Sequence, residues 1–371
     1  MYSLTRRARH VRAGAAATVL VGAMALAACG SSDNSSSSSS TTKAASTSNK
    51  PVRIAYLSFA VANSYDAPML AAAQAVASEN NSTIKVFDAN NDPKKQFAQL
   101  QTATSSGDYD AIIVQPIFGT GLITGVQDAI AAGKKVVNMD QILGKDMSTD
   151  QPQVEGLSGN VVFVPTEIGT KLGKLVTQAC QEKSLDPCNV GYLFDIKASA
   201  LDVAIKKAFD AAIAGSPVKV VAQGESFFTP ALGLKAAQNM LQAHSDMNLI
   251  VGSDQGIEGA ITAIGKKKVI LVGYGGSATG IQGVAAGKWY GDVAQLPASE
   301  GRLATEAAIK AVRTGAKAGG VNPVADLPAE GVVTKEDIGD IQERVEKAGF
   351  IPKLAGLHVP PEYAPIGLGA G

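Results

Sequence analysis

The 371-residue chain has few of the side chains on which most catalysis and metal binding depend: three histidines, three cysteines and one tryptophan. The histidines, His10, His244 and His358, are far apart, and none lies in a Cys–His or His–Glu cluster. Neither a G-x-S-x-G nucleophile elbow nor a phosphate-binding P-loop occurs. We therefore expect neither an enzyme nor a protein that holds a metal or a cofactor.

An excess of charge of either sign is also missing, because Lys plus Arg and Asp plus Glu both number 33. Residues 1–28 contain four arginines and no acid, so without them 29 basic and 33 acidic side chains remain, a net charge of −4. A mildly acidic chain is not expected to bind nucleic acid.

The first 28 residues are typical of a targeting segment. A basic stretch precedes an uncharged run over 13–28, which is shorter than a bilayer span and ends in small residues. The run closes with Leu26-Ala27-Ala28-Cys29-Gly30, which resembles the bacterial lipobox. We expect residues 1–28 to be a lipoprotein signal peptide, Cys29 to be lipidated, and the Ser-rich residues 29–50 to form a disordered tether. The alternative is an ordinary signal peptide with a chance cysteine.

Lipidation of the first cysteine leaves Cys180 and Cys188 as a pair across a short loop. In an exported protein this spacing favours a disulfide. Two free thiols remain an alternative, and a metal site is disfavoured because no histidine is nearby.

From residue 51 onward, short apolar runs alternate with helical patterns, which predicts βα repeats and parallel sheets. In the first set, strands are expected at 53–60, 83–89, 111–117 and 134–140, with helices between them. In the second set, strands are expected at 189–195, 219–225, 248–251, 269–275 and 290–296. Two such sets predict an α/β fold with two similar Rossmann-like lobes.

The order of motifs resembles the type I periplasmic binding proteins, in the sugar- and ribose-binding branch that serves ABC importers. The motifs are Asn63-Ser64-Tyr65, Asp88-Ala-Asn-Asn-Asp-Pro93, Val137-Asn-Met-Asp140, Leu249-Ile-Val-Gly-Ser-Asp254, Ile270-Leu-Val-Gly-Tyr274 and Val293-Ala-Gln-Leu-Pro297. The resemblance implies three crossings between lobes, near Ser158, Gln295 and Pro323. The first lobe would comprise 51–157 plus 296–323, and the second 158–295 plus 324–371, including the tail.

The resemblance and the strand-end rule for open parallel sheets together predict where a solute binds. In the first lobe the candidates are Asn63, Tyr65, Asp140 and Gln141. Asn63 could instead only form a turn, and Tyr65 could be a hydrophobic staple at a helix entry. Asp140 ends a buried apolar strand with no basic neighbour in sequence, which favours ligand contact.

In the second lobe the candidates are Phe228, Ser253, Asp254 and Gln295. Phe228 falls where the family places a stacking aromatic, although either it or Phe227 could be core. Asp254 could instead cap the following helix. Gln295 lies at an expected hinge crossing, where closure around a ligand would occur.

Three positions depart from the family pattern. Gln141 and Ile205 stand where these sugar binders often carry arginine, and Gly275 stands where they often carry aspartate. Such losses remove charge-assisted hydrogen bonds, so a simple pentose or hexose is in doubt as the ligand.

One motif is typical of a different function, dinucleotide binding. Gly273-Tyr-Gly-Gly-Ser-Ala278 matches a dinucleotide-binding turn, with Asp292 at roughly the distance of a ribose-binding acid. However, Asp292 lies at the start of a predicted strand, whereas that acid belongs at a strand's far end. A reductase is therefore a minor hypothesis.

The leading hypothesis is a monomeric, lipid-anchored, extracytoplasmic substrate-binding protein of an ABC importer. It would capture a small sugar-like solute by lobe closure and deliver it to a membrane permease. The alternative is a lipoprotein that presents its solute to a membrane receptor or sensor kinase.

Overall fold

The computed structural model describes residues 49–325 and 328–338. Cys29, the predicted signal peptide and most of the predicted tether lie outside these residues, as does the end of the tail. No helix within the described ranges is long and apolar enough to cross a bilayer.

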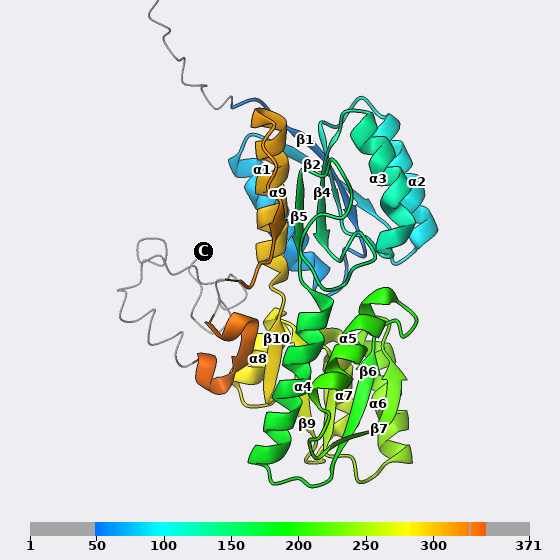
Figure 1. Ribbon diagram of the computed structural model, residues 1–371, viewed down its shortest axis with the longest axis vertical. Helices are drawn as coiled ribbons and strands as arrows, with labels where there is room; N and C mark the ends of the chain where they lie inside the picture. The colour runs from blue at the N-terminus through cyan, green and yellow to red at the C-terminus, as the bar shows by residue number, and fades with distance from the viewer. Residues whose placement is uncertain (1–48, 326–327, 339–371) are drawn as a thin grey trace, which may run out of the picture. The chain divides into compact units, whose positions relative to one another are not determined.

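The first lobe is a six-stranded parallel sheet in the order β11-β5-β4-β3-β1-β2 (Figure 1). Its strands are β1 (Arg53–Ser58), β2 (Thr83–Asp88), β3 (Ala111–Val114), β4 (Lys135–Asp140), β5 (Gly159–Val162) and β11 (Gly320–Val321). Its helices are α1 (Asp66–Glu79), α2 (Pro93–Ser105), α3 (Gly119–Ala131) and α9 (Pro297–Thr314).

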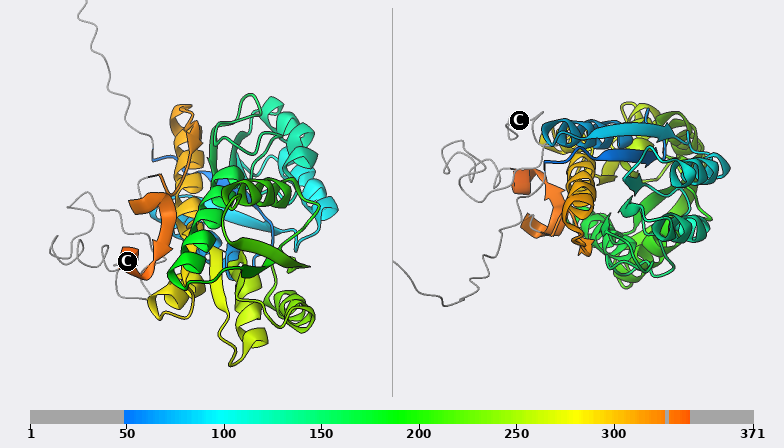
Figure 2. Two further views of the ribbon diagram at one scale, coloured as in Figure 1. Left: turned by 60° about the horizontal axis from the view of Figure 1, so that its bottom comes forward. Right: turned by 90° about the horizontal axis from the view of Figure 1, so that it is seen from above.

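Alternation along β1 builds two cores in this lobe, because successive side chains of a strand point to opposite faces. Ile54 and Tyr56 pack with α1 and α9 on one face. Ala55 and Leu57 pack with α2 and α3 on the other. Figures 1 and 2 show α9 beside α1, although more than 200 residues separate them in sequence.

The second lobe repeats the plan with the strand order β12-β10-β9-β8-β6-β7. Its strands are β6 (Cys188–Phe194), β7 (Val218–Glu225), β8 (Leu249–Ser253), β9 (Ile270–Gly275), β10 (Gly291–Ala294) and β12 (Val332–Thr334). Its helices are α4 (Pro165–Glu182), α5 (Ala200–Ala212), α6 (Pro230–Ala243), α7 (Asp254–Ile264) and α8 (Ala278–Ala285); the 3-10 helix η1 (Pro328–Gly331) precedes β12. All pairings in this sheet are parallel except that of β10 with β12.

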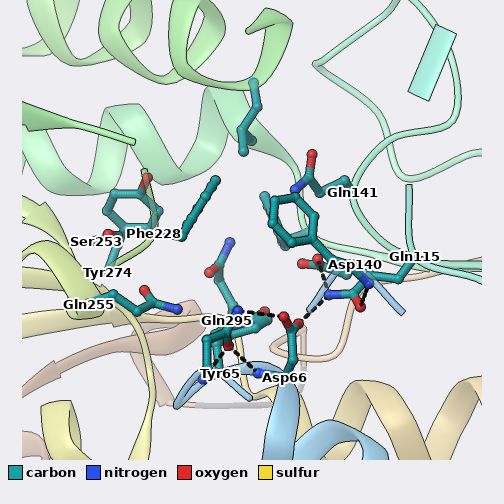
Figure 3. A pocket seen from close by; sticks show the side chains of 14 residues that line it. Tyr65, Asp66, Gln115, Asp140, Gln141, Phe228, Ser253, Gln255, Tyr274 and Gln295 are labelled. Carbon is teal, nitrogen blue, oxygen red and sulfur yellow. Dashed lines mark hydrogen bonds between the residues drawn. The ribbon is translucent and has the colours of Figure 1, made fainter. Parts of the chain in front are cut away.

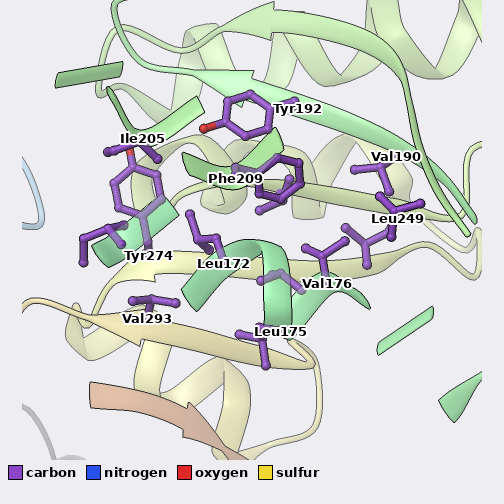
Figure 4. Close-up of a cluster of buried hydrophobic side chains, with 14 of the residues drawn as sticks. Leu172, Leu175, Val176, Val190, Tyr192, Ile205, Phe209, Leu249, Tyr274 and Val293 are labelled. Atoms are coloured by element: carbon purple, nitrogen blue, oxygen red, sulfur yellow. The ribbon is translucent and has the colours of Figure 1, made fainter. Parts of the chain in front are cut away.

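Helices α4 and α5 cover one face of the second sheet, and α6, α7 and α8 cover the other. Figure 4 shows the first of these cores, in which Leu172 and Val176 of α4 meet Ile205 and Phe209 of α5 over the strands. Gly169 allows the two helices to approach closely, since a Cβ there would lie 2.1 Å from the carbonyl oxygen of Ile205.

The predicted α/β architecture of two similar lobes is confirmed, because the two sheets have corresponding strand orders. Both lobes belong to a single compact unit. The first crossing differs in detail from the expectation: β5 still pairs in the first sheet, so the chain leaves that lobe after Val162, a few residues beyond Ser158. The second crossing lies between β10 and α9, and the third between β11 and β12.

The structure joins Cys180 and Cys188 in a disulfide bond, with an S–S distance of 2.07 Å. Cys180 lies near the end of α4 and Cys188 is the first residue of β6. The bridge therefore ties a helix end to the amino end of a strand in the second lobe, at the edge opposite the carboxyl ends.

Candidate functional site

A pocket lies where the carboxyl ends of both sheets meet. It holds about 410 Å³ of space between protein atoms, open solvent at its mouth included. Its lining residues are Phe59, Asn63, Tyr65, Asp66, Gln115, Asp140, Gln141, Phe163, Leu201, Phe228, Ser253, Gln255, Tyr274 and Gln295. They include seven of the eight candidates named from the sequence, all except Asp254.

Asn63 lies in the loop after β1 and forms the turn that starts α1. Its Oδ1 accepts the backbone N–H groups of Tyr65 at 2.9 Å and Asp66 at 2.6 Å. Its Nδ2 donates to Asp66 Oδ2 at 2.5 Å. Because an amide nitrogen carries two hydrogens, this residue both forms the turn and keeps one N–H available at the pocket wall.

Tyr65 combines a core position with a polar contact. Its ring belongs to the first-lobe core, and its hydroxyl donates to Glu300 Oε2 of α9 at 3.0 Å. Burial and the nearby Glu300 raise the pKa of Tyr65 well above its usual value, so the phenol stays protonated. The ring therefore supplies an apolar edge to the pocket.

Asp66 and Asp140 form a buried carboxyl pair bridged by one amide (Figure 3). Gln115 Nε2 donates to Asp140 Oδ2 at 3.0 Å and also to Asp66 Oδ1. Gln115 is itself held, since its Oε1 accepts the backbone N–H of Phe59 at 2.9 Å. The three side chains thus form a fixed acidic wall on the first lobe.

Burial sets the protonation of this wall. Removal from water raises the pKa of Asp66 to about 7. Burial, followed by repulsion from Asp66, raises the pKa of Asp140 to about 8. Asp140 also has a φ of 69°, a left-handed conformation that non-glycine residues rarely adopt and that often marks functional positions.

On the second lobe, Asp195 orients the hydroxyl groups of the opposite wall. It accepts hydrogen bonds from Ser253 Oγ at 2.6 Å, Tyr274 OH at 2.5 Å and Ser226 Oγ at 2.5 Å. Burial, and then the charge of Asp202, raise the pKa of Asp195 to about 7. Asp195 follows β6 and does not line the pocket itself, so it positions residues that do.

Of the two adjacent phenylalanines, Phe228 lies in the pocket. Its ring meets Phe59 of the first lobe edge to face, with ring centres 5.5 Å apart. Phe227 is 41% exposed and does not line the pocket. Both residues have a left-handed backbone, which forms the turn between β7 and α6.

Asp254 lies elsewhere than the sequence suggested. It is fully buried and does not line the pocket, and its Oδ2 accepts the backbone N–H of Ser277 at 2.7 Å. It is not the cap of α7 either, because the side chain of Ser253 caps that helix. Burial raises the pKa of Asp254, and burial together with the charge of Asp254 raises that of Asp292. The side chain of Asp254, the first residue after β8, turns inward, so its position at a strand end was not enough to place it.

Asp292 is also the candidate acid of the motif that matches a dinucleotide-binding turn. Asp292, the candidate ribose-binding acid, is fully buried and accepts the backbone N–H of Gly276 at 3.0 Å. Its carboxyl group therefore stabilises the Gly273–Ala278 turn from inside.

Gln295 lies at the second crossing between the lobes. It is 4% exposed, and its Nε2 has no hydrogen-bond partner in the described part of the chain. Figure 3 shows its amide in the middle of the pocket. The next residue, Leu296, has a φ of 64°, and Pro297 begins α9. A buried donor without a partner is costly, so this amide is ready to meet a ligand.

Sequence reasoning missed half of the lining: Phe59, Asp66, Gln115, Phe163, Leu201, Gln255 and Tyr274. Gln115 follows the buried strand β3 as Asp140 ends β4, so the strand-end rule could have found it. Phe163 follows β5, a strand the sequence pattern did not show. Two of the three positions that depart from the family pattern lie outside the pocket lining. Ile205 is a core residue, and Gly275 lies against Asp254.

Comparison with known proteins agrees with this geometry. A family model described as periplasmic binding protein domain matches residues 54–317. The ribose import binding protein of Bacillus subtilis (strain 168) is 28% identical over 228 residues, which is 60% of this chain and 69% of the relative. Its counterpart from Escherichia coli (strain K12) is 26% identical over 245 residues, or 65% and 78% of the two chains.

Solved structures show the same fold. The periplasmic solute-binding protein of an ABC transporter from Actinobacillus succinogenes 130z, with bound D-allose, is similar with a TM-score of 0.67 and 26% identity. The alignment covers 78% of this chain and 99% of that one. Since the family match spans most of the residues that form the two lobes, this protein is a member of the periplasmic binding protein family.

Proposed function

We propose that this protein is the substrate-binding lipoprotein of an ABC importer, which captures one small polar, sugar-like solute between its lobes and delivers it to a permease. The carrying observation is that side chains from both sheets wall a single pocket. A ligand there contacts both lobes at once and therefore stabilises the closed arrangement.

Contacts at the pocket show that the lobes meet around it. Ser64 of the first lobe donates to Glu258 Oε1 of α7 at 3.1 Å. Phe59 and Phe228 close another side by ring contact. A solute enclosed by these contacts is removed from water, which strengthens each polar interaction that it makes.

The lining suits a solute with hydroxyl groups and flat apolar faces. Five amide side chains and two carboxyl groups supply donors and acceptors, and five aromatic rings supply apolar surface. The relatives named above as ribose import proteins, and the D-allose complex, support this solute class. None of the lining residues forms a nucleophile–base pair, which supports binding without catalysis.

Anchoring belongs to the proposal as well. Lipidation of Cys29 with the tether 29–50 would hold the lobes near the membrane outside the cytoplasm, where a permease can accept the solute. Palmitate labelling of cells that express the protein, with Cys29→Ser as control, tests the anchor: loss of label in the variant is expected, and equal label in both would contradict it.

The binding role is tested on the chain from residue 29 onward carrying Cys29→Ser, by thermal unfolding with sugars, polyols, amino sugars and nucleosides. A ligand at 100 times its dissociation constant adds about 2.7 kcal/mol to the free energy of unfolding, which raises Tm by several degrees. No shift with any compound at millimolar concentration would refute the proposed function.

A further inference from the structure

The pocket brings two buried carboxyl groups together. Asp66 and Asp140 are 2% and 5% exposed, and both line the pocket. Among the described residues, no lysine, arginine or histidine does so. Gln115 and Asn63 donate hydrogen bonds to the pair, but amides carry no net charge.

The aromatic side chains of the lining also favour a cation. Phe59, Tyr65, Phe163, Phe228 and Tyr274 bring five aromatic rings to the pocket. An aromatic face carries a negative partial charge and attracts cations. Two carboxyl groups among such rings suit a positively charged group better than a neutral one.

Acceptor capacity remains for N–H groups. Asp140 Oδ2 is engaged by Gln115 and each carboxylate oxygen can accept two hydrogen bonds. A protonated amine supplies two or three donors together with the missing charge, which a hydroxyl group cannot do. The unpartnered Gln295 amide points into the same space and can donate to a ring or hydroxyl oxygen of the same solute.

We infer that the solute carries a protonated amine, as an amino sugar or amino polyol does, and that Asp66 and Asp140 hold this amine. The inference rests on the proposed function, because it names the class of solute that the importer protein captures. Specificity then follows from charge: only the amine brings a positive charge to the carboxyl pair, and its neutral hydroxyl counterpart of the same size does not.

Binding of a cation should also release a proton. The titratable side chains that interact with the pair come from β1, β2 and the loop before α1, and all are acidic or phenolic: Tyr56, Asp88 and Tyr65. Glu300 of α9, which interacts with both tyrosines, is acidic as well. Without a cation nearby, burial favours the protonated form of Asp140 at neutral pH and leaves Asp66 partly protonated. An ammonium group reverses that preference and expels a proton, whereas a neutral polyol does not.

Isothermal titration of the Cys29→Ser chain with matched pairs tests the inference: D-glucosamine against D-glucose, and 2-amino-1,3-propanediol against glycerol. In at least one pair the amine is expected to bind about tenfold or more tightly than its neutral partner. Its binding enthalpy should also change with the ionisation enthalpy of the buffer, which reports the released proton.

Variants assign the effect to the carboxyl pair. Asp140→Asn should reduce the preference for the amine to about threefold or less, whereas Asp128→Asn, a matched change on the exposed face of α3, should keep it. Equal or tighter binding of the neutral partners would overturn the inference and leave the proposed function standing. Failure of every amine to bind would overturn the inference as well, and only failure of all solutes would refute both.

Discussion

Replacement of Asp140 by asparagine should change how stability depends on pH. The folded-state pKa of Asp140 is about 8 because of burial, compared with 3.8 for an unperturbed aspartate. The folded protein therefore holds a proton that the unfolded chain releases over this range. Stability from this group is fully present below pH 4 and is lost as the pH rises through about 8.

The size of the effect follows from how steeply the free energy of unfolding changes with pH. One proton retained only by the folded state costs about 1.4 kcal/mol of unfolding free energy for each pH unit of increase. From pH 5 to pH 7.5 the wild type should thus lose about 3 kcal/mol through Asp140. The asparagine variant does not titrate, keeps an oxygen that can accept from Gln115 Nε2, and tolerates a positive φ.

Urea unfolding of both proteins at several pH values, without ligand, is the assay. The difference in unfolding free energy, variant minus wild type, should rise by about 3 kcal/mol between pH 5 and pH 7.5. Asp128→Asn on exposed α3 should run parallel to the wild type. Parallel curves for Asp140→Asn would refute the reasoning, because they would mean that Asp140 is ionised in the folded protein at both pH values.

Three further predictions concern the pocket and the disulfide. Phe228→Ala should weaken binding of the best solute about 10- to 100-fold by titration, since it removes a partly buried ring that lines the pocket. Phe227→Ala on the exposed neighbour should leave affinity unchanged, and equal effects would contradict the placement of Phe228. Gln115→Leu should lower the urea-derived free energy of unfolding by about 2–3 kcal/mol, because two buried carboxyl groups lose their shared donor. An unchanged value would contradict the hydrogen bonds from Gln115 to the carboxyl pair. Removal of the disulfide by Cys180→Ser with Cys188→Ser should lower the free energy of unfolding by about 2–3 kcal/mol, a value typical of so short a loop. Affinity for the solute should stay unchanged, and a loss of affinity would show that the disulfide supports the site.

The repeat pattern predicted the fold because strand and helix periodicities are local properties of the chain. β5 was missed: its residues, Gly159–Val162, include a glycine and a buried asparagine, and four residues are too few for a clear period. The strand becomes visible only through its pairing with β4.

The site was predictable where a polar residue ends a buried strand, as Asp140 does. The same rule covered Gln115, which was passed over, and misplaced Asp254, whose carboxyl group turned inward to Ser277. Side-chain direction after a strand end depends on the following turn, and that turn is set by contacts with other elements. Phe163 and Gln255 needed the three-dimensional arrangement of both lobes.

The stretch Gln295-Leu296-Pro297 contributes both to the pocket and to the link between the lobes. Gln295 lines the pocket, Leu296 carries a left-handed backbone, and Pro297 starts the helix that returns to the first lobe. An engineer who substitutes Gln295 to retune specificity would also disturb the segment that links the lobes. Because the pocket and the link between the lobes meet here, we expect a fluorophore placed beside this segment to change its emission when a solute binds.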